Sequence, residues 1–255
     1  MHISAARAVI TGGASGLGHG VAEHFIAQGA TVTLLDVQAE SGERVARELG
    51  ERAFFAQCDV TSESTVNAAM AAAANHMDGL NLLVNCAGIS GSARVLGRNG
   101  PMPGEQFAKV ININLIGTFL CDKAAAEIMQ RNPPTPDGER GVIVHTSSVA
   151  AFEGQIGQAA YSATKAGVAG MTLPLAREFA AFGIRVMTIA PGIFSTPMMA
   201  LMPQEVQDSL ARQVPFPPRL GRPVEFAQMV QAIFEIGMLN GETIRLDGAI
   251  RMQPK

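Results

Sequence analysis

Short apolar segments alternate with longer amphipathic segments along the whole chain. The short segments are apolar on both faces, which is typical of strands in a parallel sheet that helices cover on both sides. We predict such strands at residues 8–11, 31–35, 53–57, 80–84, 142–146, 185–190 and 242–246. The segments between them predict helices at residues 17–28, 39–49, 63–77, 105–130, 159–181, 203–213 and 223–236. No internal repeat or long linker divides the chain, so we expect one α/β domain over residues 1–255.

The composition excludes several classes of protein. A hydrophobic share of 47% and a mean hydropathy of +0.20 exclude a disordered chain. No apolar run approaches the roughly 18 residues that a membrane-spanning helix needs, so we expect no membrane partner. The net charge of −3 is spread along the sequence, which disfavours nucleic acid as a partner.

The cysteines and the first residues bear on the compartment. Cys58, Cys86 and Cys121 are odd in number and form no Cys-x-x-Cys pair, a pattern that favours reduced thiols over a disulfide framework. The segment 1–7 lacks the charged-then-apolar layout of a secretory signal. We therefore expect a cytoplasmic protein.

A glycine-rich segment, 11–18, joins the first predicted strand to the first predicted helix. Such a segment can be an ordinary tight turn, but between a strand and a helix its backbone amides can face an anionic pyrophosphate. Asp36 ends the next strand, 18 residues beyond Gly18, where a carboxylate can bind ribose hydroxyls and repel a 2′-phosphate. We therefore predict NAD rather than NADP as cofactor. The predicted contacts in this part are Gly12, Ser15, Gly16, Leu17, Gly18 and Asp36.

Two further segments follow predicted strands at the edge where open parallel sheets bind ligands. Asp59 and Val60 follow the third strand; Asp59 alone is equally well explained as an acid at a helix N-terminus. Cys86 follows the fourth strand, and alone it is best explained as a small packed residue, so we assign it a backbone role and no thiol chemistry. The predicted cofactor contacts of these segments are Asp59, Val60, Asn85, Cys86, Ala87 and Gly88.

Ser148, Tyr161 and Lys165 form the predicted catalytic set. Tyr161 and Lys165 are four residues apart on a predicted helix and therefore share one face, and Ser148 lies just past a strand. An ammonium beside a phenol favours the phenolate and can bring the phenol pKa toward the working range, while a serine hydroxyl can orient the substrate oxygen. A Tyr-x-x-x-Lys pair also arises by chance on exposed helices. Here Tyr161 is the only tyrosine of the chain.

Together these motifs resemble the short-chain dehydrogenase/reductase family, and the resemblance covers essentially the whole chain. It implies a doubly wound Rossmann fold with a seven-stranded parallel sheet. It also implies that Asn114 is a fourth catalytic residue, which would position a water that relays protons from Lys165. Tyr161 and Lys165 would contact the cofactor too. The family pattern further places Pro191, Gly192, Ile193, Phe194 and Thr196 along the nicotinamide.

Longer strings at 151–161, 213–221 and 240–254 resemble a branch of the family that acts on 3-hydroxyacyl-CoA thioesters and on hydroxysteroids. The resemblance implies oxidation of a short-chain (S)-3-hydroxyacyl-CoA to the 3-ketoacyl-CoA. A hydroxysteroid or another bulky secondary alcohol is the alternative substrate. A non-catalytic NAD-binding scaffold is the alternative of another class, although all four catalytic residues are present. The chain departs from the branch at 90–104 and 198–202, which puts the substrate preference in doubt.

Substrate recognition is expected from a lid at about 194–214, from residues 90–104 and from Gln155, beside Ser148 and Tyr161. The lid carries Met198, Met199 and Met202, whose flexible thioethers suit an apolar substrate, although core packing explains them as well. Three arginines are candidates for the phosphates of coenzyme A, and surface positions in solvent explain them equally well. These are Arg94, Arg98 and Arg212.

The family resemblance also implies a homotetramer that uses the long helices at 105–130 and 159–181 and the last helix and strand. Small residues at 124–126 and 166–170 would permit close approach between helices. His19 and His24 match no metal-ligand spacing with an acid or a cysteine, so we expect no metal.

Overall fold

The computed structural model describes residues 1–98, 100–200 and 202–254. Seven strands form one sheet with the order β3-β2-β1-β4-β7-β8-β9, and every neighbouring pair is parallel. The strands are β1 (Arg7–Thr11), β2 (Thr31–Asp36), β3 (Ala53–Gln57), β4 (Leu82–Asn85), β7 (Gly141–Thr146), β8 (Ile184–Pro191) and β9 (Thr243–Leu246). The order reverses direction at β1, with the chain winding outward from there on both sides. The predicted doubly wound Rossmann sheet is confirmed.

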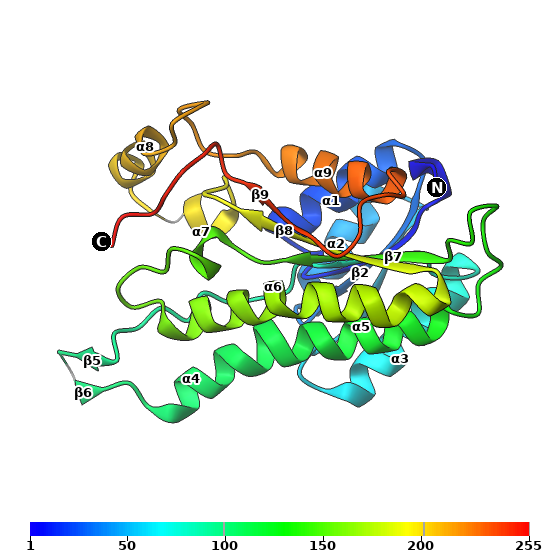
Figure 1. Cartoon of the computed structure of the whole chain (residues 1–255), viewed down its shortest axis with the longest axis horizontal. Helices are drawn as coiled ribbons and strands as arrows, with labels where there is room; N and C mark the ends of the chain where they lie inside the picture. The colour runs from blue at the N-terminus through cyan, green and yellow to red at the C-terminus, as the bar shows by residue number, and fades with distance from the viewer. Residues whose placement is uncertain (99, 201, 255) are drawn as a thin grey trace.

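Helices cover both faces of the sheet (Figure 1). One face packs on α1 (Gly16–Ala27), α2 (Ala39–Leu49) and α9 (Pro223–Glu235). The other packs on α3 (Glu63–Met77), α5 (Gly117–Met129) and α6 (Ala159–Phe179). Alternate side chains of each strand enter opposite cores: in β1, Ile10 belongs to the first and Val9 to the second. Burial on both faces explains why the strands are apolar throughout.

The long helix predicted at 105–130 is divided. It consists of α4 (Gly104–Ile111), a π-helical turn η2 (Asn112–Ile116) and α5. The period of apolar residues cannot reveal one wide turn, because a single extra residue per turn shifts the apolar face only slightly; such turns are frequent at functional sites. The remaining helical boundaries agree with the prediction to within about two residues.

Other small elements were not predicted. A hairpin of β5 (Leu96–Gly97) and β6 (Gly100–Pro101) lies within the glycine-rich segment, and α7 (Pro197–Ala200) precedes α8 (Gln204–Arg212). They are too short to give a periodic signal.

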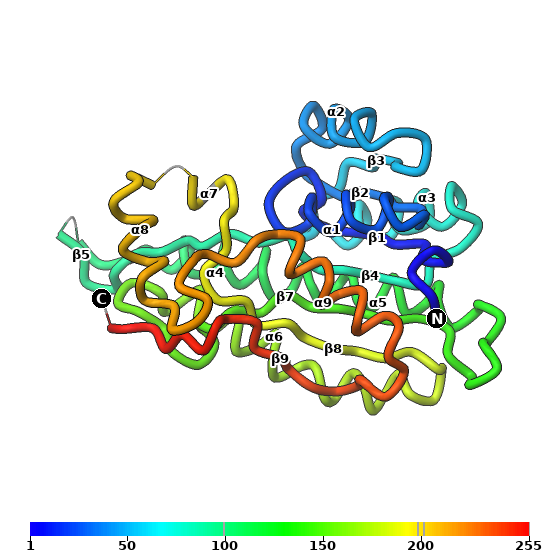
Figure 2. Tube along the Cα trace, turned by 90° about the horizontal axis from the view of Figure 1, so that it is seen from above, coloured from blue at the N-terminus to red at the C-terminus, as the bar shows by residue number. Residues whose placement is uncertain are grey.

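The catalytic end of the sheet lies opposite the N-terminus. In both views β5, α8 and the C-terminal residues gather at the end toward which the parallel strands run, and the N-terminus lies at the other end (Figures 1 and 2). Among the residues described, none of the helices has the length and apolar character needed to cross a membrane.

Candidate active site

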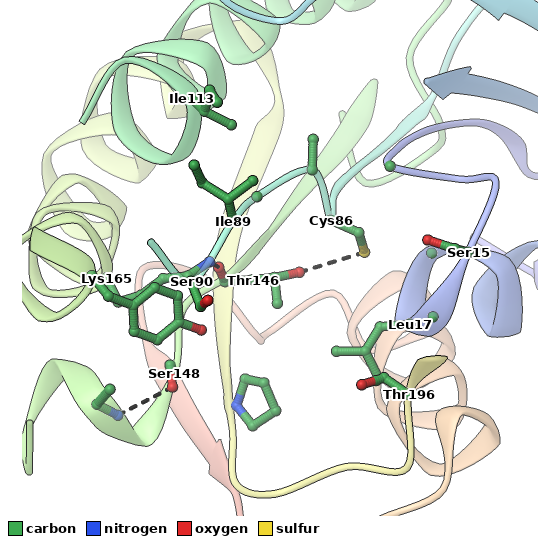
Figure 3. Close-up of a pocket in the computed structure, with 18 of the residues that line it drawn as sticks. Ser15, Leu17, Cys86, Ile89, Ser90, Ile113, Thr146, Ser148, Lys165 and Thr196 are labelled. Carbon is green, nitrogen blue, oxygen red and sulfur yellow. Dashed lines mark hydrogen bonds between the residues drawn. The ribbon is translucent and has the colours of Figure 1, made fainter. Parts of the chain in front are cut away.

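A cavity of about 1220 Å³ opens at the carboxyl ends of the strands. Its wall contains the turn after β1, the ends of β2, β3 and β4, the segment after β7, one face of α6 and the segment after β8. Figure 3 shows Ser15 and Leu17 on one side of this space and Ser148 and Lys165 on the other. A dinucleotide-sized cleft at this edge is the arrangement expected of an open α/β sheet.

The turn after β1 is shaped by close contacts that only glycine permits. Gly12 has a φ of 63°, and a Cβ on it would lie 2.9 Å from the Cα atom of Ala87 in the turn after β4. Ser15 precedes α1 without a side-chain hydrogen bond to its first amides. The first turn of α1 therefore presents backbone N–H groups and the positive end of a helix dipole to the cavity, as an anionic pyrophosphate requires.

Thr11 joins the two turns, a role that the sequence analysis missed. Its buried Oγ1 accepts hydrogen bonds from Cys86 N and Ala87 N, both at 3.1 Å. The threonine stood inside the recognised glycine segment, but nothing in the sequence distinguishes an anchoring hydroxyl from a β-branched residue that merely favours a strand.

Asp36 occupies the end of β2, at the wall of the cavity. Its Oδ2 accepts a hydrogen bond from Ala14 N at 3.2 Å and its Oδ1 one from Gln38 N at 3.1 Å. These contacts aim the carboxylate at the space beside the glycine turn. The neighbouring Val37 and Gln38 bring no positive charge.

Ser148, Tyr161 and Lys165 come together as predicted. Lys165 Nζ lies 5.6 Å from the centroid of the Tyr161 ring and donates a hydrogen bond to Thr146 O at 2.7 Å. Ser148 Oγ accepts from Ala150 N at 3.1 Å and also hydrogen-bonds the Tyr161 hydroxyl. The backbone of Lys165 is fixed as well, since Ser147 Oγ donates to Lys165 O at 2.7 Å.

The electrostatics of the pair differ from the expectation. Burial lowers the pKa of Lys165 to about 8. The pKa of Tyr161 is raised, because burial outweighs the hydrogen bond with Ser148, and Lys165 is not among the causes that lower it. The predicted lowering of the tyrosine pKa by the lysine is therefore not found. The physical reason is that both groups are removed from water, which disfavours the charged form of each.

Asn114 lies beneath the wall of the cavity, in the π-helical turn. Its Oδ1 accepts from Ile89 N at 2.9 Å and its Nδ2 donates to Ile89 O at 2.8 Å. The Nδ2 also lies 3.3 Å from Oγ1 of Thr164, the residue before Lys165. The side chain thus connects the turn after β4 with the helix that carries the catalytic pair.

Asn85 also lies beneath the wall, and its predicted contact with the cofactor is not supported. Its Nδ2 donates to Asp122 Oδ1 at 2.8 Å, and Asp122 Oδ2 pairs with His145 Nε2 at 2.9 Å. The side chains of Asp122 and His145 are both 0% exposed. His145 Nδ1 lies 3.2 Å from Thr188 Oγ1, so this buried network joins α5 to β4, β7 and β8.

The sequence analysis did not single out Asp122 or His145. A lone acid on a helix and a lone histidine in a strand carry no signal by themselves, and their pairing depends on which strands become neighbours. His145 directly precedes Thr146, whose carbonyl binds Lys165. The network therefore supports the floor of the site from inside the core.

The remaining predicted residues divide between the two ends of the cavity. Asp59 lines the wall, but its Oδ1 accepts from Thr61 N at 2.9 Å and Thr61 Oγ1 at 2.7 Å, so the carboxylate also orders the turn before α3. Gln155 lines the substrate end. The other predicted residues in the wall are Gly12, Ser15, Gly16, Leu17, Gly18, Val60, Cys86, Ala87, Gly88, Pro191, Gly192, Ile193, Phe194 and Thr196.

Residues of the expected lid also reach the cavity. Met199 and Met202 line it together with Leu210. The position of Leu201 and the side chain of Met198 lie outside the described part of the chain. Arg94, Arg98 and Arg212 are exposed and do not line the cavity. Within the described ranges, no group of three or more His, Cys, Asp or Glu side chains is placed to hold a metal ion.

A serine, a tyrosine and a lysine facing a glycine turn across the ends of a parallel sheet are the features of short-chain dehydrogenases. A family model described as short chain dehydrogenase matches residues 6–207. The chain belongs to the short-chain dehydrogenase family and is an oxidoreductase.

Three relatives span nearly the whole chain. It is 55% identical over 249 residues to a Bos taurus protein named 3-hydroxyacyl-CoA dehydrogenase type-2, which covers 97% of this chain and 95% of that protein. A Drosophila melanogaster protein of the same name is 52% identical over 254 residues, covering 99% and 100%. The solved structure of 3-hydroxyacyl-CoA dehydrogenase type-2 from Mycobacterium avium is similar with a TM-score of 0.93 and 42% identity, covering 99% and 98%.

Proposed function

We propose that this protein interconverts a secondary alcohol and a ketone with NAD, and that its substrate is a short-chain (S)-3-hydroxyacyl-CoA, oxidised to the 3-ketoacyl-CoA. The observation that carries the dehydrogenase chemistry is the placement of Ser148, Tyr161 and Lys165 around one end of the cavity, opposite the glycine turn. The names of the relatives support the substrate.

The cofactor fit is tested by the cleft itself. The uncapped first turn of α1 suits the pyrophosphate, and Asp36 suits the hydroxyls of the adenine ribose. NAD accepts a hydride from the carbinol carbon in the oxidation, and NADH returns it in the reduction. Because Ser15, Val37 and Gln38 carry no positive charge, we propose NAD over NADP. Equal or better catalytic efficiency with NADPH would contradict this choice.

Tyr161 moves the proton. In the reduction, its phenol donates a proton to the oxygen of the forming alkoxide, and its raised pKa keeps the phenol protonated at neutral pH. In the oxidation, the phenolate takes the proton of the substrate hydroxyl. The ammonium of Lys165 stabilises that phenolate and binds the nicotinamide ribose, and Ser148 holds the substrate oxygen.

Asn114 is proposed as the fourth member of the site. Its contacts with Ile89 and Thr164 support a positioning role for its side chain, since they brace the turn after β4 against α6. A proton relay from Lys165 through a water beside Asn114 stays a prediction. Loss of kcat in Asn114→Ala, with unchanged NAD affinity, would be expected of the relay.

The substrate is tested by comparing NADH oxidation with acetoacetyl-CoA, a 17-ketosteroid and a simple aryl ketone. We expect the highest catalytic efficiency with acetoacetyl-CoA. Negligible turnover of acetoacetyl-CoA beside rapid turnover of either other ketone would overturn the acyl-CoA assignment and leave the dehydrogenase chemistry intact. The alternative, a bulky secondary alcohol, is favoured by the methionine-lined wall at Met199 and Met202.

A non-catalytic NAD-binding scaffold is the alternative of another class. It would be expected to carry a damaged catalytic set, whereas Ser148, Tyr161 and Lys165 are present and close together. Tight NAD binding without turnover of any of the three ketones would favour it.

We further propose that the segment 194–214 acts as a lid over the substrate and that the protein is a homotetramer. The outer surfaces of α4, α5 and α6 expose apolar side chains that a partner subunit would cover: Phe107 is 38% exposed, and Ile116 of η2, Phe119 and Leu173 are each 44% exposed. A monomer by light scattering at micromolar concentration would contradict the tetramer. Three free thiols support a reducing compartment, and we propose the cytoplasm.

A further inference from the structure

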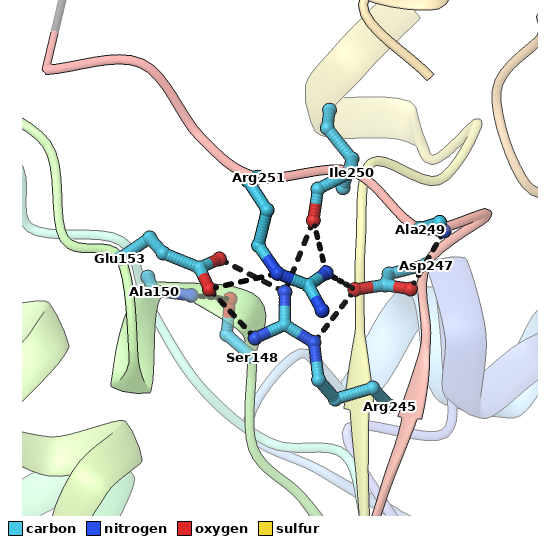
Figure 4. Close-up of polar contacts among 8 residues, drawn as sticks. All are labelled: Ser148, Ala150, Glu153, Arg245, Asp247, Ala249, Ile250 and Arg251. Atoms are coloured by element: carbon cyan, nitrogen blue, oxygen red, sulfur yellow. Dashed lines mark hydrogen bonds and ion pairs between the residues drawn. The ribbon is translucent and has the colours of Figure 1, made fainter. Parts of the chain in front are cut away.

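The last residues of the chain return to the catalytic end of the sheet. After β9, the segment 247–254, here called the C-terminal strap, runs along the segment that follows Ser148 (Figure 4). Pro254 O accepts a hydrogen bond from Ile156 N at 3.0 Å, and Gln253 O accepts one from Gln155 Nε2 at 3.0 Å. The strap is thus tied to a segment that itself borders the cavity.

Four charged side chains, here called the clamp, join the strap to that segment: Glu153, Arg245, Asp247 and Arg251. Arg245 donates from Nη1 and Nη2 to the two carboxylate oxygens of Glu153 at 2.8 and 2.9 Å, and from Nε to Asp247 Oδ2 at 2.8 Å. Arg251 approaches the same two acids from the strap, at 3.5 Å from Glu153 Oε1 and 3.4 Å from Asp247 Oδ2.

The clamp is shielded enough to be specific. The side chains of Arg245 and Glu153 are 22% and 24% exposed, and that of Asp247 is 7% exposed. The fork of Arg245 on Glu153 is the geometry in which arginine and carboxylate bind most strongly. It also lowers the pKa of Glu153, so the carboxylate stays charged across the neutral range. Two positive and two negative charges balance, and no charge of the clamp is left over.

The clamp also reaches the reacting end of the cavity. Glu153 N donates to Val149 O at 2.9 Å, one residue after Ser148. On the strap, Met252 lines the cavity and packs with Ile193 against Val149. Figure 4 shows Ser148 beside the carboxylate of Glu153, with Arg245 and Arg251 on its far side. The strap therefore contributes an apolar wall whose position depends on ion pairs rather than on the sheet.

We propose that Met252 is a specificity-determining residue for the acyl chain of the substrate and that the clamp is a set of positioning residues that holds it at the cavity wall. This rests on the proposed acyl-CoA function. A flexible thioether at the end of a strap limits the length of the acyl chain beside the reacting carbon. Loosening the strap relaxes that limit without touching the cofactor side.

The test measures kcat/KM for acetoacetyl-CoA and 3-ketooctanoyl-CoA, with NADH, in wild type, Met252→Ala, Arg251→Gln and Arg251→Lys. Met252→Ala should raise the efficiency ratio of the longer to the shorter substrate by about 10-fold, the size expected for opening a few methylenes of an apolar pocket. Arg251→Gln should raise the ratio by about 3-fold through the KM of acetoacetyl-CoA, and Arg251→Lys should recover most of the wild-type ratio, because Arg251 makes single contacts that any cation can replace.

Arg44→Gln is the matched control. Arg44 is 55% exposed and pairs with Glu48 on α2, whereas Arg251 is 59% exposed, so the same change removes a comparable exposed cation far from the cavity. Its ratio should equal that of the wild type. The dissociation constant of NADH, followed by fluorescence, and the elution volume should be the same in all variants.

The outcomes separate the two proposals. Wild-type turnover of acetoacetyl-CoA tests the proposed function, while the change in ratio tests the strap. An unchanged ratio in both Met252→Ala and Arg251→Gln would overturn the strap proposal. A parallel weakening of NADH binding in Arg251→Gln would also overturn it, since it would show general loosening of the site.

Discussion

The cofactor side and the substrate side of the cleft are built in different ways. On the cofactor side, backbone atoms of neighbouring strands meet directly, as between Gly12 and Ala87, and a fully buried pair, Asp122 and His145, supports them from the core. On the substrate side, the wall comes from the segment after β8, the C-terminal strap and loops held by partly exposed ion pairs such as Glu153 with Arg245. The difference teaches that the type of reaction belongs to the rigid sheet and the choice of substrate to what is attached to it.

Tyr161→Phe tests the point where the two sides meet. The ring is kept and only the proton donor is lost, so kcat should fall by about 1,000-fold, within the range of general acid–base catalysis. The affinity for NADH and the KM for acetoacetyl-CoA should change little, since neither side of the cleft is altered. Steady-state kinetics and fluorescence titration measure these quantities; near-normal turnover would refute the mechanism.

Asp122→Ala and Glu153→Ala compare the two ionic networks. Removing the carboxylate from a fully buried pair leaves His145 and Asn85 without their partner and should lower the free energy of unfolding by about 3–5 kcal/mol. The same change at Glu153, which is partly exposed, should lower it by about 1 kcal/mol. Urea unfolding followed by circular dichroism measures both. Equal losses would show that burial does not separate the two networks.

Asp36→Asn tests the cofactor side alone. Removing the negative charge should raise the efficiency with NADPH relative to NADH by about 30-fold, a discounted value for a like-charge contact at a partly exposed position. The ratio between 3-ketooctanoyl-CoA and acetoacetyl-CoA should stay at the wild-type value. A change in that ratio would mean that the two sides are coupled.

The pH profile examines Lys165 at the boundary. Its pKa is lowered to about 8, so the ammonium loses its proton as the pH rises through 8, whereas the raised pKa of Tyr161 keeps the phenol neutral there. The kcat/KM for NAD should therefore fall toward about tenfold per pH unit above 8, because it reports ionisation of the free enzyme. In Lys165→Arg, which stays charged, this ionisation should disappear from the profile. Its persistence would assign it to another group.

The prediction succeeded where local sequence carries a physical necessity. The strand that ends at Thr11, the glycines at 12 and 18, and the spacing of Tyr161 and Lys165 each impose a local geometry, and the structure has these features where they were expected. The order of the sheet followed because right-handed crossovers leave few alternatives for a chain of this pattern.

The prediction failed or was silent where distant segments had to meet. The pKa of Tyr161 was expected to be lowered by Lys165, but its direction depends on burial, which no spacing reveals. Asn85 was predicted to contact the cofactor, and instead it binds Asp122, 37 residues away. His145 and Thr188 carry no motif and become partners only because β7 and β8 are neighbours.

The sequence by itself determined the class of fold and the chemistry at the ends of the strands, because apolar periodicity, glycine conformation and helical spacing act over a few residues. Only the tertiary structure decided how the site is supported and bounded. Asp122 reaches His145, and Glu153 reaches Arg245 92 residues later, once the sheet has brought their strands and helices together. The physical reason is that a hydrogen bond or an ion pair needs two groups within about 3 Å, and the separation of two residues along the chain does not set their distance in the fold.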